Sequence, residues 1–482
     1  MMKLLFLLIA VSCVAQTYTV RTDTSVQAYP GTIPCPAASC SGGGSLTGSN
    51  TTITPSDFNL PMTRVTDNST LSTTNSYMWS RSGGAYALPL DITDTRFVVY
   101  TATAISVPFS WNPATLRATK LYGSNYTMAT PLPRSSVSFS FTQPYVGYAV
   151  AVNGGNNPAI YSFNFSSTTT APVGVQLVDL SACTSALARV GYEWNNDLVV
   201  SQDDQTFLVA ISTTSGQGSS GAVYVIVWNR TNGCRVWETD TGAITGSWGS
   251  TGTINLLDRF TLHNAVLGEG GTWAFVTYAT CLSSSCSSPL FKEYFWQLSG
   301  LAVTPVTDDS NCGHITLGYS NAVNECDYSS TYNQSTWYMR PFTNANEAPP
   351  ANVLNRPSGI PTETPFDQHS SWGGDNSSDT APFCTTTYTG QFSATNTYDN
   401  EILCIATNGT GTIWRFGHTF ATTLSQYFDA SIALGAMSAD GKWFLWTSDW
   451  DGMLGNTNGS SNSCGPSTNC RADVFLAQLP IR

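Results

Sequence analysis

The sequence predicts an all-β fold, a single β-propeller of seven four-stranded blades, on three observations. Residues 437–448 join the tight-turn dipeptide Asp440-Gly441 to an aromatic and β-branched run, 443–447, which is typical of a strand buried on both faces. No long stretch keeps a clean helical period. One closed ring also accounts for 482 residues, a length that otherwise indicates two or three domains.

The turn and the strand of residues 437–448 recur upstream. Residues 200–211 repeat the pattern with Asp204 at the glycine position, and residues 267–277 repeat it with Gly271 there. Residues 92–101 form a weaker copy. A unit of about fifty residues that is written repeatedly indicates a propeller.

Seven blades can be counted from residue 61 onward. Residues 222–228 and 293–298 are expected as middle strands, and 234–237 as an outer strand. Residues 61–67 resemble the outer strand that ends a blade, and 302–308 repeat that form. Six or eight blades also fit, because the second and fifth units are poorly marked. The expected inner strands centre on 97–100, 146–150, 207–210, 273–276, 314–317, 382–385 and 443–446.

The first sixty residues differ from the repeats. Residues 1–15 have the order of a signal peptide, with Lys3, an apolar run and then Cys13-Val-Ala, so cleavage is expected before Gln16. Lipidation of Cys13 is the alternative. Residues 16–60 are a loop-rich extension in which 18–22 can pair as an edge strand, and 61–482 form the propeller.

The cysteine count favours an oxidising compartment. Thirteen cysteines become twelve when Cys13 is removed. Pairing between sequence neighbours is expected, because blades contact mainly their neighbours. A structural metal site is disfavoured, since no Cys-x-x-Cys pair with partner histidines is present. The expected pairs are Cys35–Cys40, Cys183–Cys234, Cys281–Cys286, Cys312–Cys326, Cys384–Cys404 and Cys464–Cys470.

Charge restricts the class of partner. A net charge of −12 argues against nucleic acid and against an anionic membrane surface. We expect a secreted or extracytoplasmic monomer that binds an extracellular polysaccharide or a cell-surface ligand, without membrane insertion. No nucleotide-binding loop, nucleophile elbow or zinc-protease motif is present, and no organic cofactor is expected.

The pattern Ser-x-Asp-Gly-Lys-Trp-x-x-x-Thr-Ser at 438–448, with Arg64-Val-Thr-Asp67, resembles TolB-like and WD40-like secreted propellers. The resemblance covers residues 62–482 and implies the fold. A propeller is a scaffold for many activities, so it does not imply a function.

One branch, the oligogalacturonate-lyase type, holds a divalent metal with histidines and a glutamine at the centre of the ring and cleaves uronate polymers by β-elimination. Gln368-His369 is most similar to that family's ligand pattern, although no second histidine follows closely. Proton abstraction beside a carboxylate needs a base and a neutralising charge, roles that imidazole, metal and guanidinium suit. This resemblance implies His263, Gln368, His369 and His418 as ligands of Mn or Ca, and His314, Tyr338, Arg340 and Arg415 as catalytic residues.

Each assignment has a structural alternative. An isolated histidine usually satisfies a local hydrogen bond, and Arg340 and Arg415 can stack on aromatic rings between blades. Asp449, Asp451 and Asn456 are either Ca²⁺ ligands or an Asx-rich turn. Two functions therefore stay open, a metal-assisted lyase of uronate-containing chains and a non-catalytic carbohydrate- or protein-binding propeller.

Overall fold

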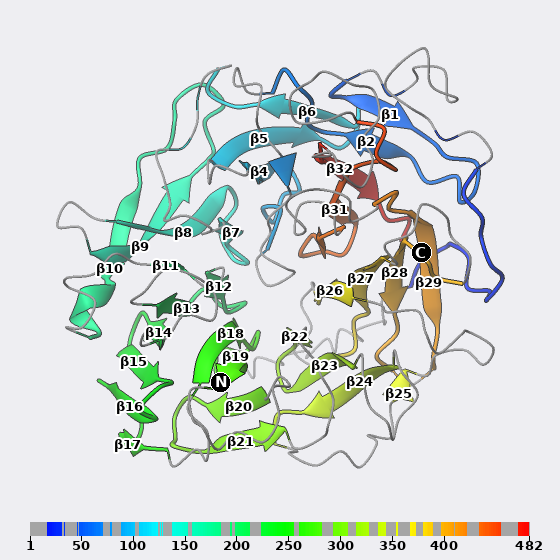
Figure 1. Ribbon diagram of the computed structural model, residues 1–482. Coiled ribbons are helices and arrows are strands. Elements are labelled where there is room, and N and C mark those ends of the chain that lie inside the picture. The colour runs from blue at the N-terminus through cyan, green and yellow to red at the C-terminus, as the bar shows by residue number, and fades with distance from the viewer. Residues whose placement is uncertain are drawn as a thin grey trace, which may run out of the picture.

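The computed structural model contains seven antiparallel sheets arranged radially around a centre (Figure 1). The all-β, seven-bladed propeller is therefore confirmed, and the alternatives of six or eight blades are removed. The structure describes residues 17–30, 33, 46, 48–70, 78–79, 88–101, 106–123, 126, 128, 137–152, 157–184, 193–194, 198–212, 223–254, 260–281, 293–306, 315–326, 336–343, 353–354, 367–372, 379–388, 397–408, 410–421, 433–454 and 471–481.

Most blades have four strands, and blade 3 has additional outer strands. From the centre outwards, blade 1 contains β3 (Met78–Trp79), β4 (Arg96–Thr101), β5 (Ser106–Asn112) and β6 (Arg117–Lys120), and blade 2 contains β7 (Ser138–Phe139), β8 (Val146–Val152), β9 (Pro158–Asn164) and β10 (Val175–Asp179). In blade 3, β11 (Glu193–Trp194) and β12 (Val199–Val200) both pair with β13 (Thr206–Ser212), which is followed by β14 (Val223–Asn229), β15 (Gly233–Glu238), β16 (Ala243–Gly246) and β17 (Gly252–Thr253).

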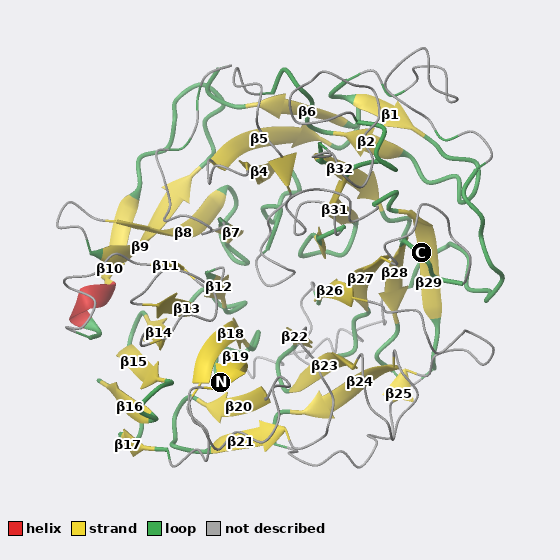
Figure 2. Cartoon of the chain, in the orientation of Figure 1, coloured by secondary structure: helices red, strands yellow, loops and turns green. Residues whose placement is uncertain are grey.

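The later blades follow the same order. Blade 4 contains β18 (Phe260–Leu267), β19 (Trp273–Cys281), β20 (Glu293–Gln297) and β21 (Val303–Val306), and blade 5 contains β22 (Ile315–Leu317), β23 (Asn321–Cys326), β24 (Thr336–Pro341) and β25 (Val353–Leu354). Blade 6 contains β26 (Asp367–Ser371), β27 (Phe383–Tyr388), β28 (Glu401–Ile405) and β29 (Ile413–His418). A single 3₁₀ turn, η2 (Leu180–Ala182), is the helical element within the described ranges (Figure 2).

Blade 7 joins the two ends of the propeller. Its inner strands are β30 (Gly435–Met437), β31 (Trp443–Ser448) and β32 (Asp473–Gln478), and its outer strands are β2 (Met62–Arg64) and β1 (Thr51–Ile53). Residues 61–67 were expected to form the outer strand that ends a blade; β2 is an outer strand of blade 7 and pairs with β32, but β1 lies outside it. The ring is thus closed by hydrogen bonds between strands from opposite ends of the chain.

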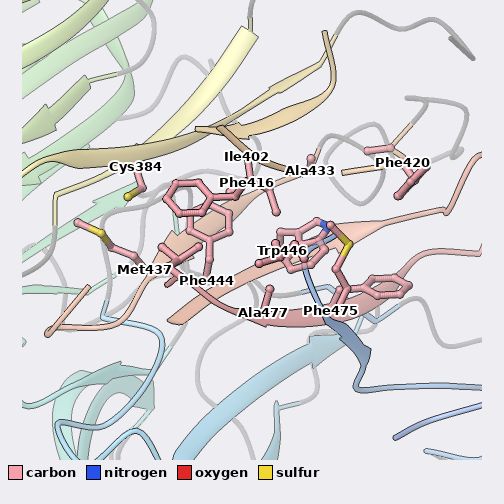
Figure 3. Close-up of a cluster of buried hydrophobic side chains, with 14 of the residues drawn as sticks. Cys384, Ile402, Phe416, Phe420, Ala433, Met437, Phe444, Trp446, Phe475 and Ala477 are labelled. Atoms are coloured by element: carbon pink, nitrogen blue, oxygen red, sulfur yellow. The ribbon is translucent and has the colours of Figure 1, made fainter. Parts of the chain in front are cut away.

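The core lies in layers between adjacent blades. One layer, between blades 6 and 7, contains Trp446 and Phe444 of β31, Phe475 of β32 and Phe416 of β29, all buried (Figure 3). All six residues of β31 are buried, as the apolar run predicts. Because each layer joins two blades, every blade is stabilised mainly by its neighbours.

The repeated turn also has the backbone conformation that the sequence predicts. The φ angle is 70° at Gly441, 67° at Gly271, 57° at Asp204 and 56° at Asp94. Glycine enters this left-handed region without steric cost, and Asp is among the few other residues that tolerate it. The four turns are therefore equivalent in structure as well as in sequence.

The expected order of strands within the blades was wrong. Six of the seven segments expected to be innermost lie in second strands, for example Phe97 in β4 and Trp273 in β19, and only 314–317 includes a first strand, β22. Second strands are paired on both edges and buried on both faces, so they have the strongest apolar signal. The innermost strands are shorter or more polar.

The extension before the propeller is partly ordered against blades 6 and 7. Tyr18 bridges to Ile481, and Arg21 bridges to Arg415 of β29, so 18–22 pairs at two single positions and does not form an edge strand. We call residues 17–30 the strap. In addition, β1 lies within 16–60 yet belongs to the sheet of blade 7.

Two predicted cysteine pairs lie at disulfide distance, Cys183–Cys234 and Cys384–Cys404. The first joins blade 3 to the end of blade 2, and the second joins β27 to β28. Each of the other four pairs includes a residue outside the described ranges. The predicted signal peptide, residues 1–15, also lies outside them. Among the described residues, no helix is long and apolar enough to cross a membrane.

Candidate functional site

The two ends of the ring have different connections. The joins between first and second strands lie at one end, here called the turn end, which also holds the joins between third and fourth strands. In blades 2, 3, 4, 5 and 7 the join between first and second strands is a short turn, whereas in blades 1 and 6 it spans 80–95 and 372–382. Because neighbouring strands are antiparallel, the joins between second and third strands lie at the opposite end, here called the loop end. In blades 3 to 7 these joins are long, spanning 213–222, 282–292, 327–335, 389–400 and 449–472.

Hydrogen bonds link the tight turns of neighbouring blades. The buried carboxylate of Asp204 in blade 3 accepts hydrogen bonds from Ser140 and Thr142 in blade 2. Asp379 in blade 6 accepts the backbone N–H of Tyr319 at 2.6 Å and that of Ser320 at 2.9 Å in blade 5. A carboxylate that accepts several N–H donors stabilises both turns, so the turn end is a rigid rim.

Blades 3, 4 and 5 are linked in the same way. The N–H of Gln202 donates to the carbonyl of Glu269 at 2.9 Å, and the N–H of Glu269 donates to that of Gly318 at 2.9 Å. The Tyr319 hydroxyl reaches back to Gln202 Oε1 at 2.8 Å. The polar groups of these turns are therefore used in holding the blades together.

Two carboxyl groups meet at the seam between blades 1 and 7. Burial, and then the neighbouring charge of Asp440, raise the pKa of Asp94 to about 7, while Lys442 opposes the shift. The carboxylate of Asp440 accepts hydrogen bonds from Lys442 and, at 2.8 Å, from Ser438. A raised pKa means that Asp94 is held protonated at acidic pH, where it donates to its neighbour instead of repelling it.

This seam predicts a pH dependence of stability. The folded pKa of Asp94 lies above its ordinary value, so its stabilising contribution is complete at about pH 4 and is lost as the pH rises through 7. Asp94→Asn keeps the tolerance for positive φ and removes the titration. We expect the variant to become more stable relative to wild type between pH 4 and 8 in chemical denaturation. A constant difference across that range would contradict the assignment.

Three of the predicted ligands lie on strands that line the centre. His263 belongs to β18 of blade 4, and Gln368 and His369 belong to β26 of blade 6. His263 and Gln368 lie in the half of their strand nearer the loop end and His369 is at the middle of β26, with β22 of blade 5 between the two strands. The structure describes the backbone at these positions, and His314, which precedes β22, lies outside the described residues.

Tyr338 and Arg340 lie on β24, the third strand of blade 5, away from the innermost strand. Arg340 is buried within the blade. Both residues are therefore separated from the central strand β22 by β23.

Arg415 and His418 lie on β29, the outermost strand of blade 6, against the expectation that they belong to a central site. Arg415 is fully buried and donates to Glu401 Oε1 at 2.6 Å and to the carbonyls of Asp23 and Ser25 at 2.9 and 2.8 Å. Its guanidinium also lies over the Tyr398 ring, 5.1 Å from the centroid. Arg415 therefore has the structural role that was the alternative to catalysis, since it stacks on an aromatic ring and pairs within the fold.

His418 pairs with Asp57, which lies in the chain before β2. Its imidazole contacts the rings of Tyr29 and Phe58 edge-on, with centroid distances of 4.6 and 5.2 Å, and it is fully buried. The pair therefore fastens the extension to blade 6.

The Asp-rich turn after β31 is also largely enclosed. Asp449 is fully buried, and burial raises the pKa of Asp451 to about 6. Burial and then Asp451 raise the pKa of Tyr29, whose hydroxyl accepts a hydrogen bond from Asn400 at 2.9 Å. Within the described part of the chain, no group of three His, Cys, Asp or Glu side chains could hold a metal ion. Asn456 lies outside it.

Sequence reasoning missed two acid-containing contacts, the seam of Asp94 with Asp440 and the pairing of Asp57 with His418. Asp94 and Asp440 occupy the repeated turn of neighbouring blades, so comparing those turns for facing acids could have found them. Asp57 and Tyr29 lie in the loop-rich extension, which has no repeat to compare, and no sequence signal links them to His418.

Comparison with known proteins shows the fold alone. No protein-family model matches the chain, and no curated protein matches it in sequence. Similar solved structures include TolB from Acinetobacter baumannii, with 12% identity, a TM-score of 0.32, and coverage of 67% of this chain and 63% of that one. The β-propeller domain of the Trilobed protease from Pyrococcus furiosus has 9% identity, a TM-score of 0.36, and coverage of 71% and 84%. The WD40 repeats of RRP9 have 8% identity, a TM-score of 0.37, and coverage of 84% and 98%. The chain is a seven-bladed β-propeller whose structural neighbours include TolB and WD40 propellers.

Proposed function

We propose that this protein is an extracytoplasmic propeller that binds a polysaccharide at the loop end of the ring, over blades 3 to 7. The observation that carries this proposal is the difference between the two ends. At the turn end, short turns join the first and second strands of five blades, and turns of neighbouring blades are hydrogen-bonded to one another, whereas the long joins between second and third strands of blades 3 to 7 begin and end at the loop end. Binding residues are concentrated on loops that a rigid scaffold positions.

The chemistry of the inner strands favours an anionic polymer bound through a cation. The chain has a net charge of −12, so direct binding of a uronate chain would meet repulsion. His263, Gln368 and His369 supply imidazole and amide groups on the inner strands of blades 4 and 6, and such groups are suitable ligands for Mn²⁺. The two cysteine pairs at disulfide distance fit an extracytoplasmic protein.

A metal-assisted lyase is the second candidate, favoured by the position of His263 and His369 on the inner strands of blades 4 and 6. A divalent metal bound there would neutralise charge that develops beside the uronate carboxylate. His314, which precedes β22 in the intervening blade, would then be the base.

One experiment tests both functions. Binding of polygalacturonate to the full chain is measured by calorimetry with and without Mn²⁺ or Ca²⁺, for wild type, His263→Ala and His369→Ala. We expect metal-dependent binding that each substitution weakens roughly tenfold or more. Gln205→Ala, an exposed change at the turn end, is the matched control and should bind like wild type.

Product formation separates the two candidates. Unsaturated products that absorb in the ultraviolet, lost with a chelator and reduced by orders of magnitude in His369→Ala, would establish the lyase. Binding without product would leave the non-catalytic function. Equal binding by Gln205→Ala and His369→Ala, both weaker than wild type, would place the ligand elsewhere.

A further inference from the structure

The join between the third and fourth strands contains the same turn in blades 1, 2, 3 and 6. An asparagine ends the third strand, or closely follows it, and the backbone N–H two residues later donates to the asparagine Oδ1. A side-chain bond of this kind defines an Asx turn, so the fold accounts for an asparagine at each position. The N···Oδ1 distances are 3.0 Å at Asn112, 2.9 Å at Asn164, 3.1 Å at Asn229 and 3.1 Å at Asn408.

Three of these turns contain a residue that the turn does not require. Asn164-Phe-Ser, Asn229-Arg-Thr and Asn408-Gly-Thr match the Asn-x-Ser/Thr acceptor sequence of N-linked glycosylation. In blade 1, Asn112-Pro-Ala makes the same turn without a hydroxyl residue, and it has proline at the position from which the acceptor sequence excludes it. The hydroxyl residue is therefore not needed to form the turn.

The hydroxyl groups of the three acceptor sequences do not hold other parts of the fold. Among the described residues, the hydroxyls of Ser166 and Thr231 make no hydrogen bond. The hydroxyl of Thr410 bonds within its own turn, to Asn408 Oδ1 at 2.7 Å and to the hydroxyl of Thr412 at 3.1 Å. Ser166, Thr231 and Thr410 are all exposed.

Two acceptor sequences elsewhere differ in this respect. In Asn50-Thr-Thr, the Thr52 hydroxyl is hydrogen-bonded across the strand pair β1–β2. In Asn68-Ser-Thr, the hydroxyl of the buried Thr70 accepts the N–H of Asp67 at 2.9 Å. The fold therefore explains those two hydroxyl residues, whereas it does not explain the ones in the three turns.

We propose that Asn164, Asn229 and Asn408 are N-glycosylation sites, so that oligosaccharides extend from the turn end at blades 2, 3 and 6. The donor is an oligosaccharide on a lipid pyrophosphate. The bond from sugar C1 to the pyrophosphate oxygen breaks, and the lipid pyrophosphate leaves with the bonding electrons. C1 forms a bond to Nδ2, which releases one proton to solvent. This goes beyond the proposed function, because it concerns the turn end and involves no ligand of the loop end.

The turns can bear a glycan without losing their hydrogen bonds, because each turn uses Oδ1 and leaves Nδ2 for the sugar. Asn164 and Asn408 are exposed, and within the described part of the chain their Nδ2 atoms make no hydrogen bond. Asn229 is half-buried, and its Nδ2 donates to Thr206 Oγ1 at 3.1 Å. A side-chain amide has two N–H donors, so one hydrogen remains to be replaced.

The composition of the chain is consistent with glycans on its surface. Charged residues make up 10% of the sequence, against about 25% in an average soluble domain. N-linked oligosaccharides are bulky and solubilising, so they supply hydration that charged side chains supply in other proteins. The two cysteine pairs at disulfide distance fit the oxidising compartment in which this modification takes place.

The test is site mapping on the full chain, secreted from a eukaryotic cell line behind a secretory signal of that host. Enzymatic release of an N-glycan converts its asparagine to aspartate, which peptide mass spectrometry detects at each site. We expect conversion at Asn164, Asn229 and Asn408 and none at Asn112. An unmodified asparagine at any one of the three would remove that site, and at all three it would overturn the proposal.

Ser166→Ala separates the modification from the turn. It keeps Asn164 and the bond from the N–H of residue 166, and it removes only the hydroxyl that the acceptor sequence needs. We expect loss of the glycan at Asn164 and, after enzymatic deglycosylation, the same midpoint of chemical denaturation as wild type. Ser166→Thr is the matched control and should keep the glycan. A glycan retained in Ser166→Ala, or lost in both variants, would contradict the assignment.

Blade 1 provides the converse test. Pro113→Ala combined with Ala114→Thr completes the acceptor sequence at Asn112, which is exposed and already makes the turn. The double variant should gain one glycan at Asn112, and Pro113→Ala alone should gain none. Failure of the double variant to gain a glycan would show that this turn is not an acceptor and would overturn the argument from its repetition.

Discussion

Replacing Asp473 with alanine should lower the free energy of unfolding by about 3–5 kcal/mol, because it leaves two guanidinium groups buried without their counter-ion. Asp473 is fully buried on β32 and accepts hydrogen bonds from Arg64 Nη2 at 2.6 Å and Arg471 Nη2 at 2.7 Å. Thr66 donates to it at 2.9 Å. Since Arg64 and Asp473 lie on β2 and β32, this contact joins the two ends of the propeller.

The measurement is chemical denaturation of the full chain at neutral pH. Asp203→Ala is the control, because Asp203 is exposed and makes only local turn contacts, so its loss should cost about 1 kcal/mol or less. A loss at Asp473 no larger than that at Asp203 would show that closure does not depend on this ion pair.

The same residue predicts an acid transition. Burial disfavours the charge, but Arg471 and Arg64 outweigh it and hold the pKa of Asp473 below its ordinary value. Its contribution is therefore present above the unfolded pKa of about 3.9 and is lost as the pH falls through the folded value. Asp473→Ala should remove that part of the acid dependence.

Deleting the strap should have the second large effect, a loss of roughly 5 kcal/mol or more. Tyr18 is buried and Tyr29 is half-buried against blades 6 and 7, and a fully buried side chain of this size contributes ~1.5–3 kcal/mol. Arg415 would also lose the carbonyls of Asp23 and Ser25. Hydrogen bonds to a charged group contribute about 1.5–3 kcal/mol each.

Denaturation and hydrogen exchange of a chain lacking 17–30 provide the check. We expect the amides of β29 to lose protection, because Arg415 no longer has Arg21 as its partner. Val26→Ala, a change within the strap at a half-exposed side chain, is the control and should be close to neutral. Unchanged protection in β29 would mean that the strap is not a structural part of blade 6.

The repeated turn was the part of the fold that local sequence specifies. A residue that tolerates positive φ must occupy that position, so the turns at Gly441, Gly271 and Asp204 could be predicted from the sequence. The order of strands within a blade could not be predicted, because the apolar character of a strand indicates burial on both faces and does not indicate its distance from the centre of the ring.

The candidate site was only partly predictable, for a related reason. Histidine and glutamine at the start of inner strands could be placed by their distance from a turn, as for His263. His418 precedes the last blade in the sequence in a similar way, yet it lies on an outer strand. Its partner Asp57 is 361 residues away, and no local pattern encodes that contact.

Closure by β2 and β32 has a consequence for folding. Arg64 and Asp473 are separated by 409 residues, whereas the paired Cys384 and Cys404 are separated by 20. Loop-closure entropy grows with the logarithm of separation, so joining the ends costs only roughly 2.7 kcal/mol more than closing a hairpin of that size. The cost is small, but the last blade cannot form until β32 has been synthesised. Until then, β2 can pair with β1 on one edge, but its other edge is open and can accept β32 from another molecule. Weakening the closing contact should thus increase strand-exchanged oligomers during folding before it unfolds the finished ring.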